Sequence, residues 1–153
     1  MRYLATCFLL ASMTTLYTGQ LSAAENIQTD YAPPKVVYDV SVSGIEGLES
    51  VLDRASYLST ITGADPFEQS IVLVSHGDEI DFFANKNADR YKDLMTRARS
   101  LVVGEVITIR MCRVAARSHG YEPQDIQDFV QMIPMGDAEI IRLQNEEDHA
   151  YMR

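Results

Sequence analysis

Residues 70–77 read SIVLVSHG, a run of apolar and β-branched residues that ends in a glycine. A continuous apolar run of this length is typical of a strand that is buried on both faces of a parallel sheet. Before it, over residues 45–61, apolar residues recur at the spacing of one helix face. The sequence around 70–77 therefore predicts strands that alternate with helices, as in βαβ units.

The same alternation continues outward along the chain. It predicts strands over residues 35–42 (KVVYDVSV), 70–77, 105–112 (EVITIRMC), 130–135 (VQMIPM) and 150–152, and helices over 45–61, 89–100, 114–119 and 137–147, with a short turn over 78–83. Consecutive parallel strands joined by helices form right-handed crossovers. We therefore expect one three-layer α/β domain, with a mainly parallel sheet of four to five strands flanked by helices.

Composition narrows the class of protein. The 153 residues carry 13 basic and 22 acidic side chains, a formal charge of -9, and 23% of all residues are charged. This length suits a single domain, and the mixture of apolar and charged residues excludes a mostly disordered chain and a polytopic membrane protein. Binding to nucleic-acid phosphates requires clustered Lys and Arg, and no such run is present, so we expect no nucleic-acid partner.

The first 24 residues have the composition of a secretory signal peptide. Arg2 supplies a positive charge, residues 4–17 are uncharged and largely apolar, and Ala23 and Ala24 suit a signal peptidase. Cleavage after Ala24 predicts a periplasmic protein with no membrane span in its mature chain; an uncleaved anchor helix is the alternative. Residues 25–34, which end in two prolines, are then an extended leader before a domain over 35–153.

Ligands of such folds bind beyond the carboxyl ends of the strands, so the loops there are candidate sites. The loop after residue 74 contains His76, which can donate a hydrogen bond or titrate near neutral pH, and Gly77, which permits backbone conformations closed to other residues. The loop after residue 133 pairs Pro134 with Gly136, at a helix start whose amides can hold an anion. A purely structural role for His76 and ordinary helix capping by Asp137 remain open.

Cys112 ends the strand over 105–112 and precedes a helix. Its sulfur is expected near unpaired N–H groups, and Arg110, Arg113 and Arg117 bring positive charge that favours a thiolate and suits an anionic substrate such as a sulfur oxyanion. The alternative is an inert, packed thiol. If Cys7 leaves with the signal peptide, Cys112 has no partner for an intrachain disulfide.

Other chemistry lacks a motif. The three histidines, His76, His119 and His149, have no metal-ligand spacing, so we expect no metal. No Gly-rich nucleotide motif and no G-x-S-x-G are present, which leaves no cofactor and no hydrolase triad to predict. The acidic residues of 78–81 are expected to form a solvated loop.

Taken together, KVVYDV, IVLVSHGDEIDFF, the strand ending IRMC and the stretch VQMIPMGDAEIIRLQNEEDHAYMR resemble the DsrE/DsrF-like family over residues 35–153. The resemblance implies a parallel-sheet domain that assembles into homotrimers or homohexamers. In some members a cysteine carries sulfur as a persulfide, and Cys112 stands at the matching position; His76-Gly77 matches a His-Gly pair. Arg113 and Val114 after the cysteine, and Asp78 after the glycine, depart from the family pattern.

Two functions from different classes follow. The first is a periplasmic sulfur carrier, or a carrier resembling a sulfurtransferase, that holds sulfane sulfur on Cys112 and exchanges it with a donor or acceptor protein. The second is a non-catalytic oligomer that binds a small ligand or anion, with Cys112 only packing. A redox sensor that forms intermolecular Cys112 disulfides is a third alternative.

Overall fold

The computed structural model describes residues 29–153, so the predicted signal peptide and residues 25–28 of the predicted leader lie outside the described residues. Residues 29–34 form no regular structure and lead into the first strand. The elements that follow are β1 (Lys35–Val40), α1 (Ile45–Ile61), β2 (Ser70–Ser75), η1 (Asp78–Phe83), η2 (Asn85–Asn87), α2 (Lys92–Val103), β3 (Thr108–Cys112), α3 (Arg113–Ser118), η3 (Pro123–Asp125), β4 (Gln131–Ile133), α4 (Gly136–Glu146) and β5 (Ala150–Met152).

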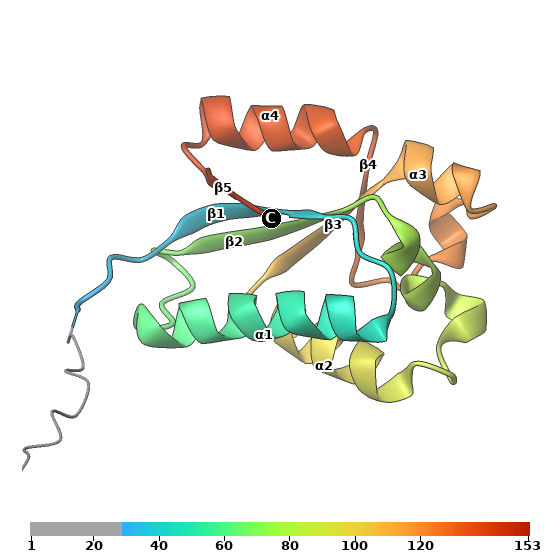
Figure 1. The fold of residues 1–153 in the computed structure, drawn as a ribbon, viewed down its shortest axis with the longest axis horizontal. Helices are drawn as coiled ribbons and strands as arrows, with labels where there is room; N and C mark the ends of the chain where they lie inside the picture. The colour runs from blue at the N-terminus through green and yellow to red at the C-terminus, as the bar shows by residue number, and fades with distance from the viewer. Residues whose placement is uncertain (1–28) are drawn as a thin grey trace, which may run out of the picture.

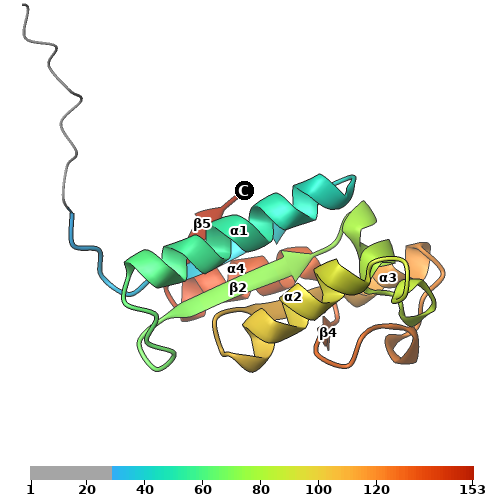
Figure 2. The same ribbon diagram turned by 90° about the horizontal axis from the view of Figure 1, so that it is seen from below.

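The five strands form one sheet in the order β4-β3-β2-β1-β5, and every pair is parallel. Helices α1 and α2 cover one face and α4 covers the other, which gives the three layers seen in Figure 1. Figure 2, viewed from below, shows α1 and α2 side by side in front of β2, with α4 behind the sheet. The predicted α/β class with its parallel sheet is confirmed.

Side-chain alternation divides the core between the two faces. The larger cluster joins alternate strand residues, among them Tyr38, Leu73 and Ile109, to the apolar sides of α1 and α2. The smaller cluster joins Val37, Val72 and Val74 to Ile140 and Leu143 of α4. One helix thus covers the second face alone, and that face carries the site described below.

Several element boundaries differ from the sequence-based expectation: most by one or two residues, and those of α2 and β3 by three. The helix expected over 89–100 is α2 at Lys92–Val103, because residues 88–91 form turns that follow η2. The strand expected from residue 105 begins at Thr108. Residues 104–106 instead close the end of α2, where the amide of Val106 donates to Leu101 O at 2.9 Å and Glu105 has a φ of 56°.

Within residues 29–153, no helix combines the length and apolar character that a membrane crossing requires.

Candidate functional site

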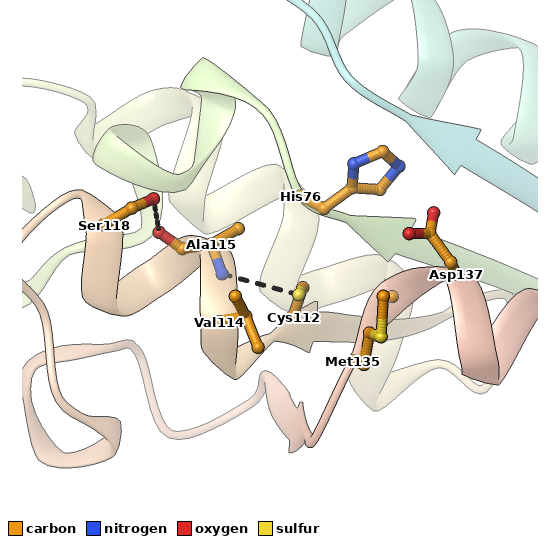
Figure 3. A pocket seen from close by; sticks show the side chains of 8 residues that line it. His76, Cys112, Val114, Ala115, Ser118, Met135 and Asp137 are labelled. Atoms are coloured by element: carbon orange, nitrogen blue, oxygen red, sulfur yellow. Dashed lines mark hydrogen bonds between the residues drawn. The ribbon is translucent and has the colours of Figure 1, made fainter.

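A cavity of about 210 Å³ opens at the carboxyl edge of the sheet, where β2 and β3 end and α4 begins. It is lined by His76, Cys112, Val114, Ala115, Ser118, Met135, Gly136 and Asp137. Figure 3 shows the sulfur of Cys112 between the start of α3 and Met135, with His76 and Asp137 on the side away from α3. Residues from three of the predicted loops therefore meet in one place, as expected for the carboxyl ends of parallel strands.

Cys112 is the last residue of β3 and caps α3. The residue is 5% exposed, and its Sγ accepts a hydrogen bond from the amide of Ala115 at 3.4 Å. That amide belongs to the first turn of the helix, whose N–H groups have no partner inside the helix. The backbone thus directs one donor at the sulfur, and Cys112 is one of the residues that line the cavity.

Gly136 brings the start of α4 close to both Cys112 and His76. A Cβ placed on Gly136 would lie 3.4 Å from Cys112 Cβ, from His76 Cβ and from His76 Cδ2. Larger side chains at position 136 would therefore fill the space between the thiol and the imidazole. Pro134 does not line the cavity; it forms an exposed bend between β4 and α4.

His76 follows β2 and is held by a carboxylate from the neighbouring strand. Its Nε2 lies 2.5 Å from Oδ1 of Asp39, and the other oxygen of Asp39 accepts a hydrogen bond from the hydroxyl of Tyr151. Burial would by itself raise the pKa of Asp39, but the hydrogen bonds from Tyr151 and His76, with the charges of His76 and Arg153, outweigh burial and lower it. Asp39 is therefore a carboxylate that accepts from both neighbours.

Gly77 does not line the cavity, and its φ of -110° is open to any residue. The expectation that a special backbone conformation requires glycine here is therefore wrong. Space is the reason instead, because a Cβ on Gly77 would lie 2.7 Å from the Cα and the Oγ of Ser41.

The expectation that arginines surround Cys112 is also corrected, since none of the residues found to line the cavity is an arginine. Arg110 shares the sheet face of Cys112, but its guanidinium pairs with Glu139 of α4. Arg113 and Arg117 are one helical turn apart on α3, whereas Val114, Ala115 and Ser118 occupy the side that faces the cavity. Arg117 pairs with Glu122 at 3.6 Å.

Glu139 of α4 pairs with Arg110 of β3 and with Arg142, which is one turn further along α4. It accepts hydrogen bonds from Arg110 and, at 2.8 Å, from Arg142. The hydrogen bond from Arg142 lowers the pKa of Glu139, and the positive charges of Arg110 and Arg142 also outweigh the opposing effect of burial. These charges therefore brace the helix that begins at the cavity and do not enter the cavity.

This pairing predicts an acid-dependent loss of stability. Because the pKa of folded Glu139 lies below its ordinary value of 4.5, the carboxylate contributes stability above that pH and loses it as the pH falls through the folded pKa. We expect the difference in unfolding free energy between the wild type and Glu139→Gln to be constant near neutral pH and to shrink in acid. Urea unfolding at a series of pH values measures it. A difference that does not change with pH would contradict the stabilising role of the Glu139 carboxylate. Glu146→Gln is the control, because it replaces an exposed carboxylate whose Oε2 lies 3.8 Å from a guanidinium nitrogen of Arg142.

The remaining histidines lie elsewhere. His119 Nδ1 is 3.7 Å from Asp81, and His149 is buried with its Nε2 2.8 Å from the hydroxyl of Ser70. In the part of the chain that the structure describes, no three His, Cys, Asp or Glu side chains are grouped to hold a metal ion.

Glu79, which the sequence assigned to a solvated loop, is completely buried. Its carboxylate accepts hydrogen bonds from the amide of Val42 at 2.9 Å, the hydroxyl of Ser75 at 2.6 Å and the amide of Gly77 at 2.9 Å. The assignment was wrong because a buried carboxylate needs donors, and these come from backbone whose position a local pattern does not reveal. Glu79 fixes the loop after β1 to the loop after β2, and so supports the backbone beside His76.

Sequence reasoning also missed Asp39 and Tyr151. One signal was present, because the alternation in KVVYDV places Asp39 on the same sheet face as Val37, with a charged side chain inside an otherwise apolar strand. Tyr151 carried no such signal, since its role depends on β5 pairing beside β1.

The fold and the cavity define a class: a small domain with an all-parallel five-stranded sheet and a buried cysteine at the edge where ligands bind. The chain belongs to the DsrE/DsrF-like family, whose family model matches residues 35–151, and the resemblance found in the sequence is confirmed. A solved structure of a protein of unknown function from Methanobacterium thermoautotrophicum is similar, with a TM-score of 0.63 and 18% identity over 78% of this chain and 98% of that one. At that identity the likeness concerns the fold. No curated protein matches the sequence.

Proposed function

We propose that this protein is a sulfur carrier in which Cys112 accepts sulfane sulfur as a persulfide and passes it to an acceptor. The observation that carries the proposal is the position of Cys112, whose Sγ accepts a hydrogen bond from the amide of Ala115 and which lines a cavity at the carboxyl edge of the sheet. A water molecule occupies about 30 Å³ of the liquid, so this cavity has room for the outer sulfur and for part of a donor.

The transfer needs no cofactor. The Cys112 thiolate attacks the outer sulfur of a donor persulfide, R–S–SH, and a new S–S bond forms as the bond inside the donor breaks. The electron pair of that bond leaves with R–S⁻, which takes a proton, while Cys112 becomes Cys–S–SH. Attack by an acceptor thiolate on the outer sulfur reverses the process and restores the thiolate of Cys112.

The cavity favours a neutral or thiol-linked donor over a sulfur oxyanion. No Lys or Arg is found among its lining residues, and Asp137 adds a carboxyl group. We therefore expect glutathione persulfide to load Cys112 faster than thiosulfate, because the dianion has no fixed cation to bind here.

The experiment is sulfur loading followed by intact mass. The full chain carrying Cys7→Ala, which leaves Cys112 as its one cysteine, is incubated with glutathione persulfide. We expect the mass of one added sulfur on this variant, its removal by dithiothreitol, and none on Cys7→Ala/Cys112→Ala. Equal loading of the double variant, or no loading of Cys7→Ala, overturns the carrier.

The second candidate is a non-catalytic binding protein, and the 5% exposure of Cys112 favours it. In that case the thiol packs against α4, alkylation of Cys112 by iodoacetamide is slow and independent of pH, and no sulfur is added.

We propose further that the carrier is a homotrimer or homohexamer in the periplasm. Family membership supports the assembly, as do the exposed apolar side chains of Val114 and Met135 at the cavity, which a second subunit would cover. Light scattering at micromolar concentration tests the assembly, and a monomer contradicts it.

The composition of residues 1–24 supports export to the periplasm. The test is the mass of the protein recovered from the periplasm, which should equal that of the chain cleaved after Ala24.

A further inference from the structure

Asp137 places a negative charge at the cavity that Cys112 lines. Of the described residues that line this cavity, Asp137 alone carries a carboxyl group, and none carries an ammonium or guanidinium group. It directly follows Gly136, where an added Cβ would lie 3.4 Å from Cys112 Cβ, so Asp137 is one residue away from a close contact with the cysteine. Figure 3 shows its side chain at the start of α4, on the side of the cavity where His76 lies.

The other charged side chains on the surrounding elements do not offset this charge. Among residues 29–153 they form ion pairs: His76 with Asp39, Arg110 and Arg142 with Glu139, and Arg142 also with Glu147. Because Asp39 is held as a carboxylate, its pair with His76 has a net charge of zero or minus one, whichever form the imidazole takes. Asp137 itself takes part in no ion pair within the described part of the chain.

Two further sources of positive charge act only weakly at the cavity. The helix dipole places about half an elementary charge at the start of α4, which offsets only part of a full carboxylate charge. Arg113 follows Cys112 in the chain but is not among the residues found to line the cavity. The balance of charge at the cavity is therefore negative.

The Asp137 carboxylate can act on a reactant without touching it. Charges in about 0.1 M salt interact over a distance of about 10 Å. A cavity of about 210 Å³ is narrower than that, so a charged group next to the sulfur under attack lies within reach of Asp137. A cation in this place is attracted, and an anion is repelled.

We propose that Asp137 is a specificity-determining residue, which selects small thiol persulfides that carry an ammonium group as the sulfur donors of Cys112. With cysteamine persulfide, the Cys112 thiolate attacks the outer sulfur, and a new S–S bond forms as the S–S bond of the donor breaks. The electron pair of the broken bond leaves on the sulfur of cysteamine, which takes a proton. This inference rests on the proposed function in taking Cys112 as the sulfur acceptor, and it adds the chemical class of the donor.

The first experiment uses two reagents that modify a thiol without transferring sulfane sulfur. They are 2-aminoethyl and 2-carboxyethyl methanethiosulfonate, which are similar in size and opposite in charge. The Cys112 thiolate attacks the sulfenyl sulfur of either reagent, a mixed disulfide forms, and methanesulfinate leaves with the electron pair.

The readout is the ratio of the cationic to the anionic rate. Rates on Cys7→Ala, in which Cys112 is the one cysteine, are followed by intact mass and divided by the rates on 2-mercaptoethanol. Because both reagents consume the same thiolate, the ratio does not respond to a change in the amount of thiolate. It reports the charge that the reagent meets at Cys112.

We expect the ratio on Cys7→Ala to exceed that on the free thiol. Adding Asp137→Asn should lower it about fivefold, the effect of removing one unit charge within several ångström of the reagent in a water-like medium. Asp137→Glu keeps the charge and should keep the ratio, whereas a role in helix capping alone would leave the ratio unchanged in both variants. In about 1 M salt, where charges interact over only about 3 Å, the effect of Asp137→Asn should shrink.

Glu49→Gln is the matched control, because it removes an exposed carboxylate from α1, on the opposite face of the sheet from α4 (Figure 1). Its ratio should equal that of Cys7→Ala. An unchanged ratio in Asp137→Asn, an equal loss in Glu49→Gln, or failure of both reagents to modify Cys112 overturns the inference.

The second experiment loads the same variants with cysteamine persulfide and with 3-mercaptopropionate persulfide. Cysteamine persulfide should load Cys112 faster, and Asp137→Asn should reduce its advantage. If neither persulfide loads Cys112 while the reagent ratios follow the expectation, the carrier fails and the charge selection stands. If both persulfides load at rates that Asp137→Asn does not change, the carrier stands and the charge selection fails.

Discussion

Replacing Glu79 with alanine is expected to lower the free energy of unfolding by about 4 kcal/mol, because three buried donors lose their acceptor at once. The side chain is completely buried and accepts three hydrogen bonds, from two backbone amides and one hydroxyl. In the alanine variant these donors keep their positions but lose their acceptor, and each unsatisfied donor costs about 1–3 kcal/mol.

Urea unfolding monitored by circular dichroism measures the loss. The stability of Glu79→Gln should fall between those of the wild type and Glu79→Ala. Its amide keeps one acceptor oxygen, but its NH₂ group would face groups that are themselves donors. Glu49→Ala, at an exposed position of α1, is the control and should change stability by less than about 0.5 kcal/mol. A Glu79→Ala variant as stable as that control would mean that water or rearranged backbone satisfies the donors.

Gly77→Ala is expected to cost about 3 kcal/mol, the upper end of the range for forcing extra atoms into packed structure. The added Cβ would lie 2.7 Å from Ser41 Cα, Ser41 Oγ and Glu79 Oε2. One of these is backbone, and Glu79 is fixed by its hydrogen bonds, so neither can move cheaply. The loop beside His76 must therefore shift.

The same substitution at Gly136 is the matched control for Gly77→Ala. There the added Cβ meets its neighbours at 3.4 Å, and α4 gains a better helix former. We expect the two urea midpoints to differ clearly, with Gly136→Ala close to the wild type. Equal midpoints would show that the loop after β2 yields without cost. In the double variant Gly77→Ala/Glu79→Ala, the two losses should not add, because the carboxylate in the clash has gone.

The spacing of apolar residues, together with the Gly and Pro residues that flank them, was sufficient to predict the order of strands and helices. The helix Ile45–Ile61 and the last strand Ala150–Met152 have the expected bounds, because apolar spacing and flanking residues are local properties of the sequence. The start of α2 was displaced by three residues, since η2 and the turns after it use main-chain hydrogen bonds with no apolar period. Such segments become visible only when the neighbouring elements are in place.

The rule that loops meet at the carboxyl ends of parallel strands correctly predicted that Cys112, His76 and Gly136 lie together. It did not reveal what neutralises the arginines, because Arg110 finds its partner in Glu139 on a helix that sequence could place only roughly. The pairing of His76 with Asp39 across neighbouring strands was missed for a similar reason, because the two residues are far apart in the sequence. Strand register decides which charges meet, and the pattern of apolar residues does not specify register finely enough to name partners.

The pairing of β1 with β5 has a consequence for the order of events during synthesis. Val36 and Ala150 are register partners, although nearly the whole domain separates them along the chain. While the protein emerges from the ribosome, β1 therefore keeps an open edge until the last strand of the sheet arrives. Tyr151 arrives with that strand, so Asp39 acquires its second hydrogen bond in one of the final steps of folding.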